Sequence, residues 1–226
     1  MELNSKTMGL TALTGSLLTA ALPIQAQKAA KSQQDRDAAP NIIVILADDL
    51  GFSDLGCYGS EISTPNLDAL AADGLRATQL YNSARSCPTR ASLLTGLYPH
   101  QTGLGHMDSK PPKWPRGYRG FRNDSDNVTI AEVLGDAGYY TAMAGKLHLG
   151  RHVNPTERGF EDYYGLLGGC NSFWDPSVST RLPEGSPQIE YADGEFYATD
   201  AITDYAISFA SKAKQVQRPM FLYLAY

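Results

Sequence analysis

The segment Asn41–Ala47 restricts the fold more than any other, because it is an unbroken apolar, largely β-branched run after its first residue. Such a run, without polar alternation, is typical of a parallel strand that is buried on both faces. Met220–Ala225 is a second run of this kind. Residues 77–82 and Tyr139 to Ala144 fit further strands. The sequence therefore predicts a sheet of buried strands.

Segments with helical periodicity lie between these strands. Helices are expected from Asn66 to Asp73, from Thr89 onward, from Thr129 to Ala137 and from Thr199 to Lys214. Alternating strands and helices predict an α/β fold with a largely parallel sheet flanked by helices. Residues 107–127 and 171–196, rich in Pro, Gly, Asp and Arg, are expected to form long surface loops.

Polar residues follow the predicted strands. Asp48 and Asp49 follow the first, Ser86 the second and Lys146 the third. Ligands of parallel sheets bind at the carboxyl ends of strands. The carboxylate pair is a hard oxygen site suited to Ca²⁺ or Mg²⁺. Alternatively, one of the two carboxylates caps the N-terminus of a helix and the other is solvated. Asp54 fits a cap or turn better than a ligand.

Ser86 begins the motif Ser86-Cys87-Pro88-Thr89-Arg90. A serine hydroxyl is a weak nucleophile and needs a base, a metal or chemical conversion. Pro88 suits a first helical turn, where a missing amide donor costs little. The planar fork of Arg90 is suited to oxyanions.

Lys146 and His148 alternate on a segment expected to be extended, so their side chains should project to the same side. A lysine can stabilise developing negative charge, and a histidine can take a proton near neutral pH. His100 and His106 are expected to make structural hydrogen bonds instead.

These segments together resemble the sulfatase family over residues 40–226. The resemblance implies an alkaline-phosphatase-like fold and the pattern nucleophile-x-Pro-x-Arg, which assigns Ser86, and not Cys87, as the nucleophile. It implies that Ser86 is oxidised to formylglycine. One hydroxyl of the hydrated aldehyde then attacks sulfur and the other expels sulfate. Arg90, Lys146 and His148 are implied as catalytic. A serine-type motif implies a bacterial host and a radical-type maturing enzyme.

The resemblance also implies Ca²⁺, in preference to Mg²⁺, bound by Asp48, Asp49 and modified Ser86. Calcium takes six to eight oxygens, and no second carboxylate pair follows a strand in this sequence. We therefore expect residues 40–226 to be the truncated N-terminal portion of a sulfatase catalytic domain. Such a portion should bind metal poorly and turn over little alone.

The bulk composition narrows the class of protein. With 226 residues and 42% apolar content, the chain can build a core, and its net charge of −5 does not favour nucleic acid. No apolar run is long enough to cross a membrane. Residues 1–26 resemble a secretory signal, although a disordered leader has similar composition, and residues 27–39 a flexible lead-in. We expect export to the periplasm or medium. The three cysteines form neither a metal cluster nor a disulfide framework.

The function expected from the sequence is an arylsulfatase-like sulfuric ester hydrolase. Two alternatives stay open: a phosphoryl hydrolase of the same superfold using unmodified Ser86, and an inactive fragment that binds sulfated glycans. The expected substrate is a sulfated small molecule or a sulfated glycan. The sequence does not choose between them.

Overall fold

The computed structural model describes residues 39–107, 110–111 and 113–226. The predicted signal segment, and the predicted lead-in up to residue 38, lie outside the described residues. In the described part, no helix has the length and apolar character needed to cross a membrane.

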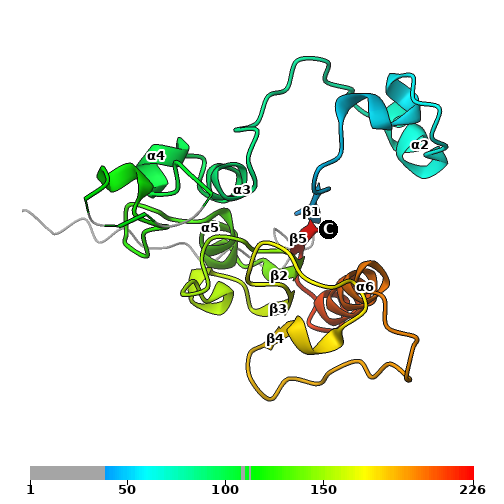
Figure 1. The fold of residues 1–226 in the computed structure, drawn as a ribbon. Helices are drawn as coiled ribbons and strands as arrows, with labels where there is room; N and C mark the ends of the chain where they lie inside the picture. Colours follow the sequence, from blue (N-terminus) through cyan, green and yellow to red (C-terminus); the bar gives the residue numbers. More distant parts are fainter. Residues whose placement is uncertain (1–38, 108–109, 112) are drawn as a thin grey trace, which may run out of the picture. The chain divides into compact units, whose positions relative to one another are not determined.

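A five-stranded sheet in the order β1-β5-β2-β3-β4 forms the centre of the fold (Figure 1). The pairs β1–β5, β5–β2 and β2–β3 are parallel, and β3–β4 is antiparallel. The predicted largely parallel α/β architecture is therefore confirmed. The strands span Ile42–Leu46 (β1), Tyr140–Gly145 (β2), Asp162–Gly165 (β3), Thr180–Leu182 (β4) and Met220–Ala225 (β5).

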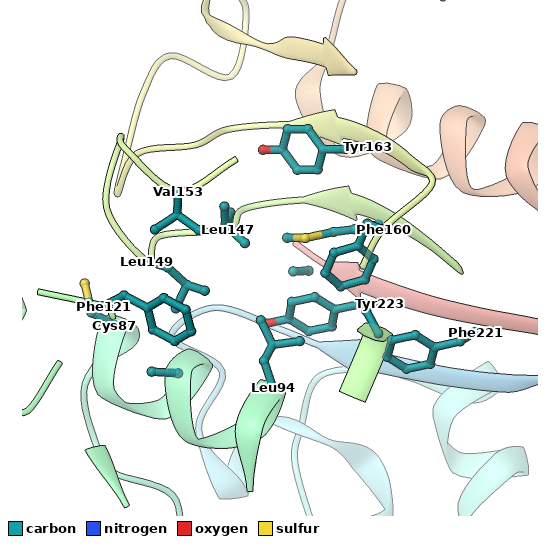
Figure 2. Packing of buried hydrophobic residues seen from close by; sticks show 14 of the residues in the cluster. Cys87, Leu94, Phe121, Leu147, Leu149, Val153, Phe160, Tyr163, Phe221 and Tyr223 are labelled. Carbon is teal, nitrogen blue, oxygen red and sulfur yellow. The ribbon is translucent and has the colours of Figure 1, made fainter. Parts of the chain in front are cut away.

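Helices cover the two faces of the sheet. One face packs against α6 (Ala198–Gln215), which buries Tyr205 and Phe209. The other packs against α3 (Ser86–Thr95) and α5 (Ile130–Asp136). Figure 2 shows this second core, where Phe160 and Phe221 stack with ring centroids 6.1 Å apart, near Leu94 of α3. The remaining helices are α2 (Pro65–Asp73), α4 (Pro99–Thr102) and the 3-10 segments Phe52–Asp54, Gly56–Tyr58, Arg116–Tyr118, Pro155–Arg158 and Pro176–Val178.

Close backbone contact sets the spacing of β2 and β5. Gly145 has φ +107°, and a Cβ built there would lie 1.8 Å from the carbonyl oxygen of Ala225. Only glycine tolerates both this backbone angle and this approach. The glycine thus holds the carboxyl ends of the two central strands together, beside the residues that follow them.

Three sequence predictions about the fold are wrong. Residues 171–196 are not all loop, because Thr180–Leu182 (β4) pairs with β3. Residues 77–82 form no strand, and Leu80 and Tyr81 are exposed there, because no described strand lies beside them to take up their backbone hydrogen bonds. The strand β1 is not buried on both faces: Ile43 and Ile45 are each 53% exposed. The reason is that β1 is an edge strand and α6 packs mainly over β2, β3 and β5.

Candidate active site

The residues predicted to carry chemistry meet at the carboxyl ends of β1 and β2. A cavity of about 920 Å³ is lined by Asp48, Asp49, Ser86, Lys146 and His148. Arg90 lies one helical turn beyond Ser86 on α3, and its side chain contacts Ser86, Asp48 and the Lys146 carbonyl. Each predicted site residue is therefore in this cluster.

Ser86 is held by two side chains. His148 Nδ1 lies 2.8 Å from Ser86 Oγ, and Arg90 Nε donates a hydrogen bond to that oxygen at 3.1 Å. Ser86 is the first residue of α3, and the backbone N–H groups of this first helical turn, which have no partner within the helix, lie at the cavity. The Ser86 hydroxyl therefore lies beside a histidine that can accept a proton and beside the Arg90 guanidinium, at the positive end of a helix dipole.

Arg90 is almost fully buried, with 1% of its side chain exposed. Its Nη1 donates to the carbonyl of Lys146 at 2.6 Å, and its Nη2 donates to Asp48 Oδ1 at 3.1 Å. The phenol oxygen of Tyr223 lies 3.5 Å from Nη1, and burial raises the pKa of this phenol to about 12. One guanidinium therefore ties α3 to the strand ends of β1 and β2. Sequence reasoning missed Tyr223, because nothing distinguishes it within an apolar strand.

Asp48 forms two ion pairs. Its second carboxylate oxygen accepts a hydrogen bond from Lys146 Nζ at 2.5 Å. Partial burial raises the pKa of Asp48, but the hydrogen bond and charge of Lys146, together with Arg90, outweigh burial and hold the pKa below its ordinary value. The carboxylate is therefore charged at neutral pH.

The backbone bends sharply at the cavity. Among the described non-glycine residues, four have positive φ, and three of these line it: Asp49 (54°), Ala84 (52°) and His148 (50°). Such angles cost energy and concentrate at functional sites. Lys146 and His148 both line the cavity, as predicted, but the segment after β2 is not regularly extended there, because His148 has a left-handed φ.

Other histidines and Asp54 behave as the sequence predicted. His100 Nε2 lies 2.8 Å from the Tyr118 hydroxyl, and His106 Nε2 lies 3.2 Å from Arg85 Nη1. Asp54 accepts a hydrogen bond from the amide of Gly51 and caps a 3-10 turn.

The described residues include the right type of ligand for a divalent cation, but too few such ligands. Asp48 and Asp49 are hard oxygen donors at one strand end, yet no group of three His, Cys, Asp or Glu side chains with metal-binding geometry occurs in the described part of the chain. Both oxygens of Asp48 are already engaged by cations. The described residues thus supply two hard oxygen donors, which are too few by themselves for the six to eight that calcium takes.

Gly169 positions the histidine. A Cβ built on Gly169 would lie 2.6 Å from His148 Nε2, whereas one on the neighbouring Gly168 would have its nearest contact at 3.5 Å. The loop backbone therefore packs directly on the imidazole ring. Sequence analysis missed this contact, although the paired glycines Gly168 and Gly169 could have indicated a close approach of the backbone.

We expect Gly169→Ala to push His148 away from Ser86 and to lower kcat for the ester hydrolysis that the sequence predicts by about 10- to 100-fold, because misplacement near 1 Å costs that much. The thermal midpoint should fall far less than activity does. Steady-state kinetics on Gly169→Ala and on the control Gly168→Ala check this. Equal activities of the two variants would contradict the assigned contact.

Comparison with known proteins identifies this arrangement. The sulfatase family model matches residues 40–226. The chain belongs to the sulfatase family. It is 39% identical over 207 residues to an arylsulfatase of Klebsiella aerogenes, covering 86% of this chain and 43% of that protein. It is 47% identical over 216 residues to human arylsulfatase A, covering 82% and 40%.

Solved structures agree with the assignment to the sulfatases. The PsFucS1 sulfatase from Pseudoalteromonas sp. matches with a TM-score of 0.66 and 26% identity, covering 85% of this chain and 44% of that one. A complex of BT4656 with its substrate D-glucosamine-2-N,6-O-disulfate matches with a TM-score of 0.65 and 33% identity, covering 82% and 34%. This sulfatase chain spans less than half the length of the relatives it matches.

Proposed function

We propose that the protein hydrolyses sulfate esters, with Ser86 providing the reacting group. The observation that carries the proposal is the pair of contacts on Ser86 Oγ: His148 Nδ1 at 2.8 Å and Arg90 Nε at 3.1 Å. Family membership and the likeness to arylsulfatases support the same reaction. We assign Ser86, Arg90, Lys146 and His148 as catalytic residues.

Each of the proposed catalytic residues has a separate role at the Ser86 oxygen or at the sulfate. His148 holds or moves a proton at the Ser86 oxygen, since its Nδ1 is within hydrogen-bond distance of that atom. Arg90 fixes the same oxygen and is itself fixed by Asp48 and the Lys146 carbonyl. The ammonium group of Lys146, at the cavity wall, is placed to stabilise negative charge on a sulfate oxygen.

We further propose that Ser86 is converted to formylglycine by a radical-type maturing enzyme, which removes two hydrogens from the serine. The hydrated aldehyde would supply two geminal hydroxyls, one to accept the sulfuryl group and one whose deprotonation releases sulfate. An unmodified serine lacks the second hydroxyl and therefore an internal route for that release.

Mass spectrometry of protein from its native host tests this modification. Because Arg85 and Arg90 flank the motif, trypsin should release residues 86–90 as a short peptide. Conversion of Ser86 removes two hydrogens and leaves Cys87 reactive toward iodoacetamide. Loss of the thiol would assign the modification to Cys87 instead. Intact Ser86 in active enzyme would exclude the aldehyde and favour a phosphoryl hydrolase with an unmodified serine.

We propose a divalent metal beside Ser86, Ca²⁺ in preference to Mg²⁺, with Asp48, Asp49 and modified Ser86 among its ligands. The charged state of Asp48 and the position of both carboxylates at one strand end support it. Bound there, the metal would stabilise negative charge near the reacting oxygen. The remaining ligands would come from outside the described residues.

A calcium titration of this 226-residue chain measures how complete the site is. We expect binding weaker than about 1 mM, since two carboxylates are too few for tight calcium binding. Isothermal titration calorimetry with the chain and with Asp49→Asn checks this. A dissociation constant below about 10 μM that rises in Asp49→Asn would show that the described residues suffice.

We also propose that the substrate is a sulfated small molecule or a sulfated sugar. The arylsulfatase relatives and the disulfated glucosamine in one related structure support this class. Export to the periplasm or medium stays a proposal, because the segment predicted to direct it lies outside the described residues.

A further inference from the structure

The residues that line the cavity include two arginines that the proposed mechanism does not use, Arg85 and Arg151. The side chain of Arg85 makes one hydrogen bond, to His106. Within the described part of the chain, neither guanidinium forms an ion pair, and Arg151 has no hydrogen-bond partner. Both residues are exposed. Arg90 and Lys146, by contrast, are both paired with Asp48.

Each of these arginines is close to a residue proposed to be catalytic, Arg85 in the sequence and Arg151 in space. Arg85 directly precedes Ser86. Arg151 lies against the loop that holds the histidine: a Cβ on Gly168 would be 3.5 Å from Arg151 Nη2, and one on the next residue, Gly169, would meet the His148 ring. Arg151 and His148 therefore pack on neighbouring glycines. Two segments far apart in the sequence thus bring cations to the lining of one cavity.

The cavity lining carries charges of both signs. Its two carboxylates, Asp48 and Asp49, both follow β1. Asp48 is paired with Arg90 and Lys146, and in the described part of the chain neither carboxylate forms an ion pair with Arg85 or Arg151. Guanidinium groups bind carboxylates and sulfates through paired hydrogen bonds, and a cavity concentrates their field.

We propose that Arg85 and Arg151 bind a second anionic group, a carboxylate or a sulfate, on the alcohol portion of the ester. The preferred substrates are therefore at least doubly anionic, and a singly sulfated neutral alcohol is a poor substrate. This inference rests on the proposed function of the cavity, and it names which esters the cavity selects.

Matched substrate pairs test the selection in protein purified from its native host. The first pair is glucosamine 6-sulfate carrying either an N-sulfate or a neutral N-acetyl group. The second is 4-sulfooxybenzoate and its neutral methyl ester. In the wild type we expect kcat/KM to favour the anionic member of at least one pair, and that pair identifies the sulfate or the carboxylate as the second group.

The decisive variant is Arg151→Gln. We expect it to lower kcat/KM for the anionic member by about 10-fold or more, as loss of a charge-assisted hydrogen bond does, and to change the neutral member less than about twofold. Adding Arg85→Gln should enlarge the selective loss. Arg116→Gln, which removes an exposed arginine that does not line the cavity, is the charge control and should change neither.

Binding without turnover separates this inference from the proposed function. In Ser86→Ala, the anionic member should bind more tightly than the neutral one by calorimetry, and Arg151→Gln should remove the difference. If no member is hydrolysed by the wild type but this difference is seen, the hydrolase proposal fails and the anion site stands. Equal affinities within both pairs, or equal losses in Arg151→Gln, would overturn the anion site.

Discussion

Replacing Ser86 by alanine is expected to lower the proposed hydrolysis of sulfate esters by about 10⁴-fold or more, which is the loss typical of removing a catalytic nucleophile. Alanine keeps the start of α3 but removes the oxygen that His148 and Arg90 both contact. Burst and steady-state kinetics on protein matured in its native host measure the loss. The thermal midpoint should change little, because Ser86 is only partly buried.

The control for this prediction is the neighbouring Cys87→Ser. Cys87 is buried, and its thiol donates to the carbonyl of Met107, a contact that a hydroxyl can also make. We expect this variant to keep most activity and the proposed modification at Ser86. Activity that survives Ser86→Ala, or that disappears only when Cys87 is changed, would refute Ser86 as the reacting residue.

Replacing Asp162 by asparagine is expected to lower the free energy of unfolding by about 3 kcal/mol. Asp162 is fully buried, pairs with Arg181 at 2.5 Å and Lys212 at 2.6 Å, and accepts a hydrogen bond from Tyr140 at 2.6 Å. Asparagine would leave the buried Arg181 guanidinium without its counter-charge. Urea denaturation of the variant measures the loss, with Glu184→Gln, an exposed site, as the charge control.

The pH dependence of that loss follows from the pKa of Asp162. Burial raises this pKa, but the hydrogen bonds from Lys212, Tyr140 and Arg181 outweigh burial and lower it below its ordinary value. A lowered pKa in the folded state stabilises the protein above the unfolded pKa, near 3.9, and this contribution disappears as pH falls through the folded value. The difference between wild type and Asp162→Asn should thus be constant above about pH 5 and shrink below about pH 4. A loss under about 1 kcal/mol at pH 7 would contradict the assigned pairing.

The pattern of apolar residues correctly predicts the elements that the rest of the fold covers and pairs. The run Met220–Ala225 is a strand with those bounds, and the predicted helix 199–214 matches α6 to within one residue at each end. Patterning fails where a partner is missing: β1 lacks cover on one face, and residues 77–82 lack a strand to pair with. Strand formation needs hydrogen bonds from elsewhere in the chain, and local sequence does not report whether they are present.

Within the candidate site, the sequence by itself determined the kinds of side chain and some of their places: Asp48 and Asp49 after β1, Lys146 after β2, and Ser86 at the start of a helix and not after a strand. The register of Pro88 and Arg90, through the resemblance to the family pattern, also predicts Ser86 and not Cys87 as the nucleophile. Such information is local, because the end of a strand and the first turn of a helix are encoded by neighbouring residues.

Only the tertiary structure decided how these side chains meet. It buried Arg90 between Ser86 and Asp48, turned His148 toward the serine through a left-handed backbone angle, and packed Gly169 on the imidazole. It also brought Arg85 and Arg151 to one cavity from distant segments. Contacts of this kind join residues some 40 to 130 positions apart, so they depend on which strands pair and in which register. No local pattern carries that choice.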